Sequence, residues 1–197
     1  MTPVSSLGPR FLTGRSIALE PLEERHHAEL LKAAADPETW TYIPVDPNNG
    51  FARRLPWIVK ENAEGRFITF VVRRLSDDAI VGSTTYLNIA PADAKVEIGF
   101  TWYTADARGG PVNPQAKYLL LKNAFEAHFN RVEFKTDARN ARSRAALLKL
   151  GAKEEGTLRG HIWMPQGYFR DSVYFSILAS EWPQVRGNLE TRLAAYT

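Results

Sequence analysis

Hydrophobic and polar residues alternate along several short stretches of the chain, and this period of two predicts β-strands. The strands are expected over residues 15–22, 67–74, 80–89, 95–103, 131–137, 153–163 and 171–178. Leucine and alanine recur at helical spacing elsewhere, which predicts helices over residues 23–35, 51–64, 113–128, 140–150 and 180–197. Residues 1–14 are expected to form an irregular lead-in. This order predicts a single α+β domain over residues 1–197, with helices flanking a mixed, mostly antiparallel sheet of seven strands.

Capping and turn residues sharpen these boundaries. Asn113 is a favourable N-cap residue and Pro114 suits a first helical position, so a helix is expected to begin there. Gly151 stands where a residue in the left-handed conformation ends a helix. Pro56 must either start or kink the helix over residues 51–64, and Gly82 is expected to mark a bulge in its strand.

The composition is that of a folded globular protein. Hydrophobic residues make up 44% and charged residues 24% of the 197 residues, which excludes a disordered chain. The absence of cysteine excludes disulfides, thiolate nucleophiles and cysteine zinc sites. The longest stretch without a charge runs over 14 residues from Ala79 to Ala92, whereas a membrane-spanning helix needs about 20. Because residues 1–12 also lack a secretion-signal pattern, we expect a cytoplasmic protein that does not bind membranes.

The charge is nearly balanced overall but not locally. A formal net charge of +3, from 25 Lys+Arg and 22 Asp+Glu, gives no general case for nucleic-acid binding. Residues 131–170, however, carry nine Lys or Arg and four Asp or Glu, a local excess of five. This excess predicts an anionic ligand, and a small phosphorylated molecule fits as well as RNA.

A glycine-containing loop lies between the strand that ends at Tyr103 and the helix expected from Asn113. Gly109 and Gly110 let the backbone approach an anion closely, at the positive end of a helix dipole. The loop therefore indicates a phosphate site, and the alternative is a plain turn in which Asn113 only caps its own helix.

The strand over residues 95–103 carries a carboxylate. Strict alternation places the odd-numbered positions from Glu97 to Tyr103 on one face and the even-numbered positions from Val96 to Trp102 on the other. The even-numbered set is hydrophobic and is expected to be core. Glu97 then lies either in solvent or in a cleft, where a carboxylate can act as a general base.

No residues are spaced as metal ligands. The four histidines, His26, His27, His128 and His161, are interpreted as structural or surface residues. The helix over residues 140–150 begins with polar and basic residues, which by themselves indicate only a solvated first turn.

Together these segments resemble the GNAT superfamily of acyl-CoA-dependent N-acyltransferases, in particular its branch related to ribosomal-protein N-terminal acetyltransferases. The element order is the one that family uses, over nearly the whole chain. The family's pyrophosphate loop, Q/R-x-x-G-x-G/A, compares with residues 106–111, where Arg108 and Gly109 match and Asp106 and Pro111 do not. Because Pro111 has no N–H, Val112 is expected to supply more of the phosphate cradle, together with the next residue.

The stretch over residues 140–151 resembles the branch more closely. The branch often reads N-x-x-S followed by K-x-G, which matches Asn140, Ser143, Lys149 and Gly151. The segments 97–99 and 170–173 are also similar to this branch. Many relatives outside the branch carry a tyrosine seven residues after the asparagine, where it protonates the departing thiolate. Leu147 stands there in this chain, and the resemblance makes Ser143 the replacement.

The resemblance implies a mechanism. Acetyl-CoA would bind where two neighbouring strands splay apart, with its pantetheine arm along the edge over residues 101–103. Glu97 would deprotonate a primary amine that attacks the thioester directly, and Ser143 would assist thiolate departure. The implied cofactor-binding residues are Thr101, Trp102, Tyr103, Arg108, Gly109, Gly110, Val112, Asn113, Asn140, Ser143, Arg144 and Lys149, with Arg142 as a further candidate for the adenosine 3′-phosphate. No metal is implied.

The acceptor is expected to be a small-molecule amine or a protein N-terminus, and a homodimer is left open. Aromatic residues in two loops are expected either to line an acceptor pocket or to belong to the core or a dimer surface: Trp40, Tyr42, Trp163, Tyr168 and Phe169. Two alternatives remain at this point. One is a catalytically silent acyl-CoA-binding sensor or interaction module, and the other is an RNA-binding domain that uses the basic residues of 131–170.

Overall fold

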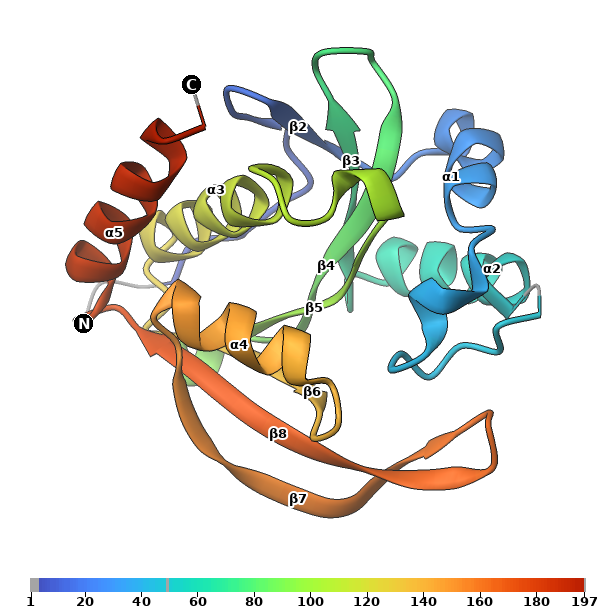
Figure 1. The fold of residues 1–197 in the computed structure, drawn as a ribbon. Coiled ribbons are helices and arrows are strands. Elements are labelled where there is room, and N and C mark those ends of the chain that lie inside the picture. Colours follow the sequence, from blue (N-terminus) through green and yellow to red (C-terminus); the bar gives the residue numbers. More distant parts are fainter. Residues whose placement is uncertain (1–3, 49, 197) are drawn as a thin grey trace.

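The computed structural model describes residues 4–48 and 50–196 of the chain (Figure 1). The strands are β1 Leu12–Thr13, β2 Ile17–Pro21, β3 Ile68–Arg74, β4 Ile80–Ala90, β5 Lys95–Tyr103, β6 Arg131–Asp137, β7 Lys153–Met164 and β8 Tyr168–Leu178. The α-helices are α1 His27–Ala33, α2 Gly50–Ala63, α3 Val112–Glu126, α4 Ala141–Leu150 and α5 Trp182–Ala194. Short 3-10 helices are η1 Glu24–His26, η2 Pro37–Trp40, η3 Pro91–Asp93 and η4 Ala105–Ala107.

The strands form one sheet in the order β1-β2-β3-β4-β5-β6-β8-β7. Every neighbouring pair is antiparallel except β5 and β6, which run parallel. The predicted mixed, mostly antiparallel α+β architecture is therefore confirmed. The sheet has eight strands and not seven, because Leu12 and Thr13, expected to be irregular, pair with Leu19 and Ala18.

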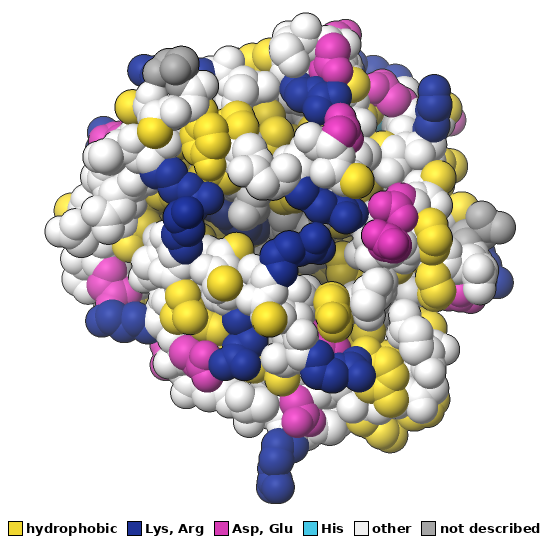
Figure 2. Space-filling model, viewed as in Figure 1, with side chains coloured by type: hydrophobic (Ala, Val, Ile, Leu, Met, Phe, Trp, Pro, Cys, Tyr) yellow, Lys and Arg dark blue, Asp and Glu magenta, His cyan; other side chains and the backbone are white. Residues whose placement is uncertain are grey.

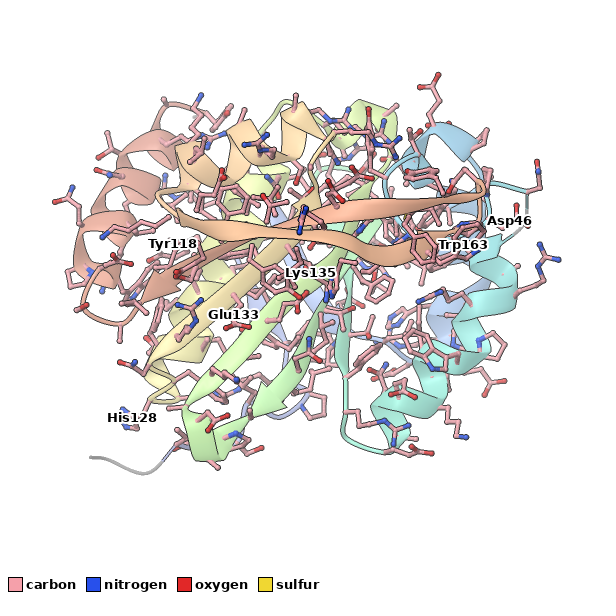
Figure 3. The ribbon with its side chains drawn as sticks, turned by 90° about the horizontal axis from the view of Figure 1, so that it is seen from below. Asp46, Tyr118, His128, Glu133, Lys135 and Trp163 are labelled. Carbon is pink, nitrogen blue, oxygen red and sulfur yellow. The ribbon has the colours of Figure 1, made fainter. Side chains whose placement is uncertain are left out.

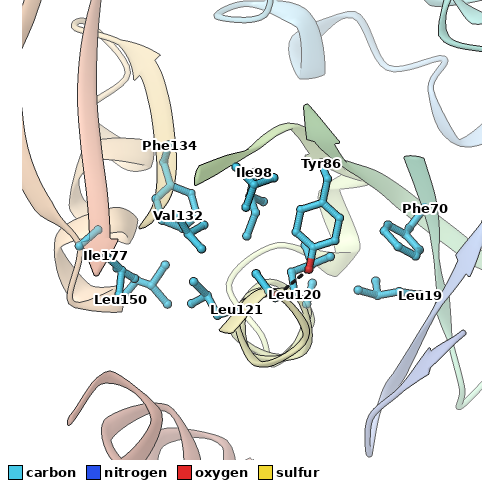
Figure 4. Packing of buried hydrophobic residues seen from close by; sticks show 14 of the residues in the cluster. Leu19, Phe70, Tyr86, Ile98, Leu120, Leu121, Val132, Phe134, Leu150 and Ile177 are labelled. Atoms are coloured by element: carbon cyan, nitrogen blue, oxygen red, sulfur yellow. Dashed lines mark hydrogen bonds between the residues drawn. The ribbon is translucent and has the colours of Figure 1, made fainter. Parts of the chain in front are cut away.

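The larger hydrophobic core lies between the sheet and the helices α3, α4 and α5 (Figure 4). Leu120 and Leu121 of α3 are fully buried in this core, which also contains Val132 and Phe134 of β6. Burying such a side chain stabilises the fold by about 1.5–3 kcal/mol. The hydroxyl of Tyr86 donates to the Leu120 carbonyl at 2.5 Å, which gives this buried phenol a partner.

A smaller core lies on the opposite face, beneath α1 and α2. Trp40 stacks on Phe51, with ring centroids 5.1 Å apart, and both rings contact Trp102 of β5. The indole of Trp40 is 2% exposed and donates to the Ala34 carbonyl at 3.0 Å. Trp40 is therefore a core residue, one of the two alternatives that the sequence left open.

Local signals define α4 well. The side chain of Asn140 accepts from the Ser143 N–H at 3.0 Å, as an N-cap residue does, and Gly151 ends the helix with φ +99°. Val185 approaches Gly151 closely, because an added Cβ would lie 3.0 Å from its Cγ2. Both ends of this helix confirm the prediction.

The starts of two other helices differ from the prediction. Pro111 already has helical torsion angles and its carbonyl accepts from the Gln115 N–H at 2.9 Å, so α3 begins at Val112. Asn113 is therefore inside the first turn and is not the N-cap. The helix α5 begins at Trp182, with Glu181 as its N-cap, and not at residue 180 as expected. Within the described part of the chain, no helix combines the length and hydrophobicity needed to cross a bilayer.

Candidate functional site

A bulge in β5 determines which side chains share a face of this strand. Gly99 pairs with Thr85 and Trp102 pairs with Ser83, so one residue of β4 lies opposite two residues of β5. Phe100 adopts φ +47° at this point. The bulge exchanges the two faces of the strand beyond it, and strict alternation was therefore wrong over residues 100–103.

The exchange places Tyr103 in the larger core with Val96 and Ile98, whereas Trp102 belongs to the smaller core. Thr101 also lies on the α3 side, because its hydroxyl accepts a hydrogen bond from Lys117 of α3. Glu97 and Thr101 thus lie on opposite faces of β5. In a site formed around β5, the Glu97 carboxylate and the Thr101 hydroxyl therefore lie on different sides of the strand.

The strands β5 and β6 separate soon after they begin. They pair only from Lys95 with Arg131 to Glu97 with Glu133, and β5 then continues to Tyr103 without a partner on that edge. A cleft of about 1260 Å³ opens where they part. Figure 2 shows a hollow in this face of the molecule with Lys and Arg side chains gathered around it. An unpaired strand edge of this kind offers backbone hydrogen bonds to an extended ligand.

Glu97 lines this cleft and is only 1% exposed. Its Oε2 accepts from Asn88 Nδ2 at 2.8 Å and from Lys135 Nζ at 3.1 Å. Figure 3 shows Lys135 beneath the β7–β8 hairpin, on the side of the sheet that this hairpin covers. Of the two alternatives for Glu97, solvent or cleft, the structure has the cleft.

The loop before α3 exposes backbone groups to the same cleft. Gly109 has φ +81°, and a Cβ added at Gly109 or Gly110 would have nothing within 4 Å. In the described part of the chain, neither glycine N–H donates a hydrogen bond. Both amides are thus open to an anionic ligand at the N-terminus of a fifteen-residue helix. Pro111 and Pro114 contribute no N–H to this end of the helix.

Arg108 holds this loop in place. Its Nε donates to the Tyr103 carbonyl at 3.0 Å, and its guanidinium also donates to Thr39 Oγ1 at 2.8 Å. The side chain therefore ties the end of β5 to η2. Its guanidinium also lines the cleft.

The structure brings most of the predicted cofactor-binding residues to the cleft. They are Thr101, Trp102, Tyr103, Arg108, Gly109, Gly110, Asn113, Asn140 and Ser143. Three others lie outside the cleft lining. Val112 is buried in the larger core, Arg144 donates to Glu154 at 3.2 Å, and the Lys149 side chain is exposed beyond the cleft. Arg142, the further candidate for a phosphate contact, lines the cleft. Leu147, which stands where the resemblance would place a tyrosine, also lines it.

Aromatic and basic residues of the β7–β8 hairpin form the other end of the cleft. Trp163 and Tyr42 line it, and Trp163 is 56% exposed with its ring edge-on to Phe169 at 4.9 Å. The buried Arg170 donates to the Tyr42 carbonyl at 3.0 Å, and burial lowers its pKa. Tyr168 lies outside this lining, and the guanidinium of Arg139 stacks on its ring at 3.8 Å.

His161 belongs to the same end of the molecule. Its ring lies 5.8 Å from that of Tyr174 on the neighbouring strand. Burial lowers the pKa of this imidazole, and the positive charges of Lys135 and Arg170 lower it further. The negative charge of Glu97 acts on this pKa in the opposite direction.

One residue of the cleft was not predicted. Lys117 of α3 is 6% exposed, and its Nζ donates to Thr101 Oγ1 at 2.9 Å. Burial lowers the pKa of this amine to about 7. A signal was present in the sequence, because Lys117 lies three and four residues before Leu120 and Leu121 and so falls on the buried face of the helix.

Much of the basic excess over residues 131–170 is neutralised. Ion pairs join Arg131 to Glu133 and Glu155, Lys135 to Glu97, Arg139 to Asp137, Arg144 to Glu154 and Lys153 to Glu181. Arg170 is buried and lines the cleft. Of the other basic residues in this stretch, Arg142 and Arg170 line the cleft, whereas Lys149 and Arg159 lie outside its lining.

The histidine prediction also has a structural outcome. His26 is buried, accepts from the Glu23 N–H at 3.0 Å and contacts Glu20 at 3.0 Å, so it has a structural role at the start of α1. Among residues 4–48 and 50–196, no three His, Cys, Asp or Glu side chains are grouped so that they could hold a metal ion.

Comparisons with known proteins agree with this geometry. The family model described as "Acetyltransferase (GNAT) domain" matches residues 16–153. The Bacillus subtilis (strain 168) protein named "Putative ribosomal N-acetyltransferase YdaF" is 32% identical over 109 residues, which are 55% of this chain. The match spans only 58% of that relative's own length.

Solved structures match over nearly the whole chain. A GCN5-related N-acetyltransferase from Brucella melitensis is 27% identical with a TM-score of 0.87, covering 94% of this chain and 86% of that one. Mycobacterium smegmatis RimJ in complex with CoA-disulfide is 25% identical with a TM-score of 0.77, covering 95% and 92%. The splayed strands, the open glycine loop and the matched family model lead to one conclusion: the chain belongs to the GNAT acetyltransferase family.

Proposed function

We propose that this protein transfers an acetyl group from acetyl-CoA to a primary amine by direct attack, without a covalent enzyme intermediate. The observation that carries the proposal is the position of Glu97, a buried carboxylate at the point where β5 and β6 part, in the same cleft as the free amides of Gly109 and Gly110. Family membership supports acyl transfer from acetyl-CoA in general, and the CoA complex of the RimJ structure supports the choice of cofactor.

The residues of the cleft fit the cofactor in three places. The N–H groups of Gly109 and Gly110 donate no hydrogen bond within the described part of the chain and would hold the diphosphate. The unpaired edge of β5 beyond Glu97 would hold the pantetheine arm as an added strand. Arg142 at the start of α4 lines the cleft and would contact the 3′-phosphate. When bound, acetyl-CoA supplies an activated thioester.

Glu97 would accept the proton that the amine loses, either directly or through a water molecule. Lys135 and Asn88 hold the carboxylate in position through hydrogen bonds of 3.1 and 2.8 Å. Because the chain has no cysteine, a route through an acyl-cysteine cannot operate.

The acceptor would enter from the end of the cleft formed by Tyr42, Trp163 and Arg170. The Bacillus subtilis relative, named a "Putative ribosomal N-acetyltransferase", favours protein N-termini as one acceptor class, and small-molecule amines are the other.

Two measurements test the proposal. Calorimetric titration with acetyl-CoA should show binding, and the absence of binding at millimolar cofactor would refute the proposal. Release of free thiol from acetyl-CoA should then be measured with a panel that combines N-terminal peptides of ribosomal proteins with polyamines, amino acids and aminoglycosides. Release with at least one amine is expected, whereas binding without release across the panel would contradict the enzymatic part.

A further inference from the structure

A buried amine lies in the floor of the cleft, on the α3 side of β5. Lys117 Nζ donates to Thr101 Oγ1 at 2.9 Å and lies 5.6 Å from the centre of the Phe134 ring. Thr101 belongs to β5 and Phe134 to β6, so the amine lies between the two strands that splay apart. All three residues line the cleft.

Some of the hydrogen-bond donors of the Lys117 amine have no acceptor among the described residues. An ammonium has three N–H donors, and one of them is directed at Thr101 Oγ1. That hydroxyl lies 2.8 Å from Thr84 Oγ1, so its own proton has a partner as well. Among the described residues, Lys117 Nζ has no second hydrogen-bond acceptor and no carboxylate within 4.0 Å. Its remaining donors are available to a ligand in the cleft.

The position is costly for a charge. Burying an ammonium without a counter-ion is unfavourable, and this burial lowers the pKa of Lys117 to about 7. A leucine or methionine would occupy the same position beside Phe134 without this cost. The buried amine of Lys117 therefore lowers the stability of the fold, and it is close to half-protonated at neutral pH.

The charged groups around the cleft do not neutralise this amine. The other charged side chains that line the cleft are Glu38, Arg54, Glu97, Arg108, Lys135, Arg139, Arg142, Arg170 and Arg192. Glu97 lies on the opposite face of β5, where Lys135 occupies it. The titratable side chain of β5 on the α3 side is Tyr103, whose pKa burial raises well above its usual value. Lys117 thus titrates as an isolated group, without a nearby charge that would hold it in one form.

We propose that Lys117 stabilises and protonates the thiolate that leaves when acetyl-CoA reacts. The inference rests on the proposed function. As the C–N bond to the acceptor forms and the C–S bond breaks, the electron pair of that bond goes to sulfur and one proton passes from Lys117 Nζ to it. Lys117 becomes neutral and takes a proton from solvent for the next cycle. The proton lost by the attacking amine goes to Glu97.

The chemistry of the neighbouring residues favours this assignment. Leu147 of α4 lines the cleft without a proton to give. An ordinary thiol has a pKa of about 8.5, which is close enough to the pKa of about 7 of Lys117 for a proton to pass between the two groups. Ser143, the other candidate donor, has a hydroxyl whose proton is far less acidic than that of either group.

The direct test is the ionisation of CoA bound to the protein. Thiolate formation is followed by its ultraviolet absorbance as pH is raised, with saturating CoA on the wild-type protein and on Lys117→Met. The charged form of Lys117 beside the sulfur favours the thiolate, so part of the thiolate forms before Lys117 loses its own proton. We therefore expect the thiolate to form at lower pH in the wild type than in Lys117→Met. Equal midpoints in the two proteins would overturn the proposal.

Two further variants separate charge from proton transfer. Lys117→Arg keeps the charge but does not release a proton, so it should retain the low thiol pKa while acetyl transfer slows. Lys117→Met should lose both, with a rate reduction of about a hundredfold, typical of a lost general acid. Ser143→Ala should change the thiol pKa little. If Ser143→Ala shifts the thiol pKa and Lys117→Met does not, the role belongs to Ser143.

A measurement on the wild-type protein needs no variant to fold. The ammonium of Lys117 is observed by NMR through its side-chain carbon or nitrogen, with either CoA or S-methyl-CoA bound. The thiolate of CoA should raise the pKa of Lys117, whereas the thioether cannot ionise and should not. The same pKa with both ligands would contradict the proposal. Failure of CoA itself to bind would instead count against the proposed function.

Discussion

Lys135 Nζ donates to Glu97 Oε2 at 3.1 Å, across the two strands at the point where they stop pairing. Glu97, the acidic partner of this pair, is only 1% exposed to solvent. A cation and an amide hold this carboxylate in one orientation through Oε2, and its Oε1 accepts no hydrogen bond from the described residues.

Replacing Glu97 with glutamine should remove the proton acceptor and preserve the shape of the side chain. We expect thiol release to fall by about a hundredfold in kcat/KM, because a general base contributes at least this much. Acetyl-CoA binding by calorimetry should change little. The matched control is Glu133→Gln, its neighbour in the β5–β6 register, which pairs with Arg131 away from the cleft. Equal activity of both variants would exclude Glu97 as the base.

Replacing Gly109 with valine should weaken acetyl-CoA binding by about tenfold or more, which is a loss of about 1.4 kcal/mol. Its φ of +81° is unfavourable for a branched residue, and the loop must move its free amide to relieve the strain. Gly65→Val is the control, since Gly65 has φ +71° and equally open surroundings outside the cleft. Both variants should lose similar stability. Equal binding by both would mean that the Gly109 amide does not contact the ligand.

The sequence left both Trp40 and Trp163 as either core or acceptor-pocket residues, and their substitution should have opposite effects on stability and acceptor binding. Trp40→Ala should cost about 3–5 kcal/mol in the free energy of unfolding, because it empties the stacked cluster with Phe51 and Trp102. Trp163→Ala should change stability by less than about 0.5 kcal/mol, since its ring is 56% exposed. Its effect should appear in the KM for the acceptor. A stable Trp163→Ala protein with an unchanged acceptor KM would remove Trp163 from the acceptor end.

Lys117 should make the stability of the protein pH-dependent. The folded protein holds this amine at a pKa of about 7, whereas the unfolded chain binds the proton up to about pH 10.5. The unfolded state therefore carries more protons between pH 7 and 10.5, and stability rises with pH over this window. Lys117→Met removes this linkage and should be more stable than the wild type at pH 7. Urea denaturation of both proteins at several pH values measures the difference in their free energies of unfolding. A difference that does not narrow toward pH 10.5 would contradict the claim that burial lowers the pKa of Lys117.

Signals that act within a few residues were sufficient for much of the fold. The helix α4 could be placed from Asn140 and Gly151 alone, because each acts on its own turn of the chain. The start of α3 was misplaced, since the preference of Asn113 for a cap competes with a proline at 111 that already has helical torsion angles. In that case the conformation of one neighbour decided the boundary.

The site could be predicted only in part, because two of its features depend on pairing between distant segments. The bulge at Phe100 arises in the register between β4 and β5, and it reverses the faces that alternation assigned. Lys117 was overlooked because a single lysine in a helix is usually solvated, and only its packing against Thr101 and Phe134 shows that it is buried.

The central claim is that the cleft between β5 and β6 binds acetyl-CoA through the open amides before α3. The most direct measurement is the NMR titration of a ¹⁵N-labelled sample with acetyl-CoA, in which the Gly109 and Gly110 amide signals are followed. Both signals should shift and saturate together with those of residues 101–103 along the edge of β5. Unchanged glycine signals at millimolar acetyl-CoA, with shifts elsewhere or none at all, would contradict the account.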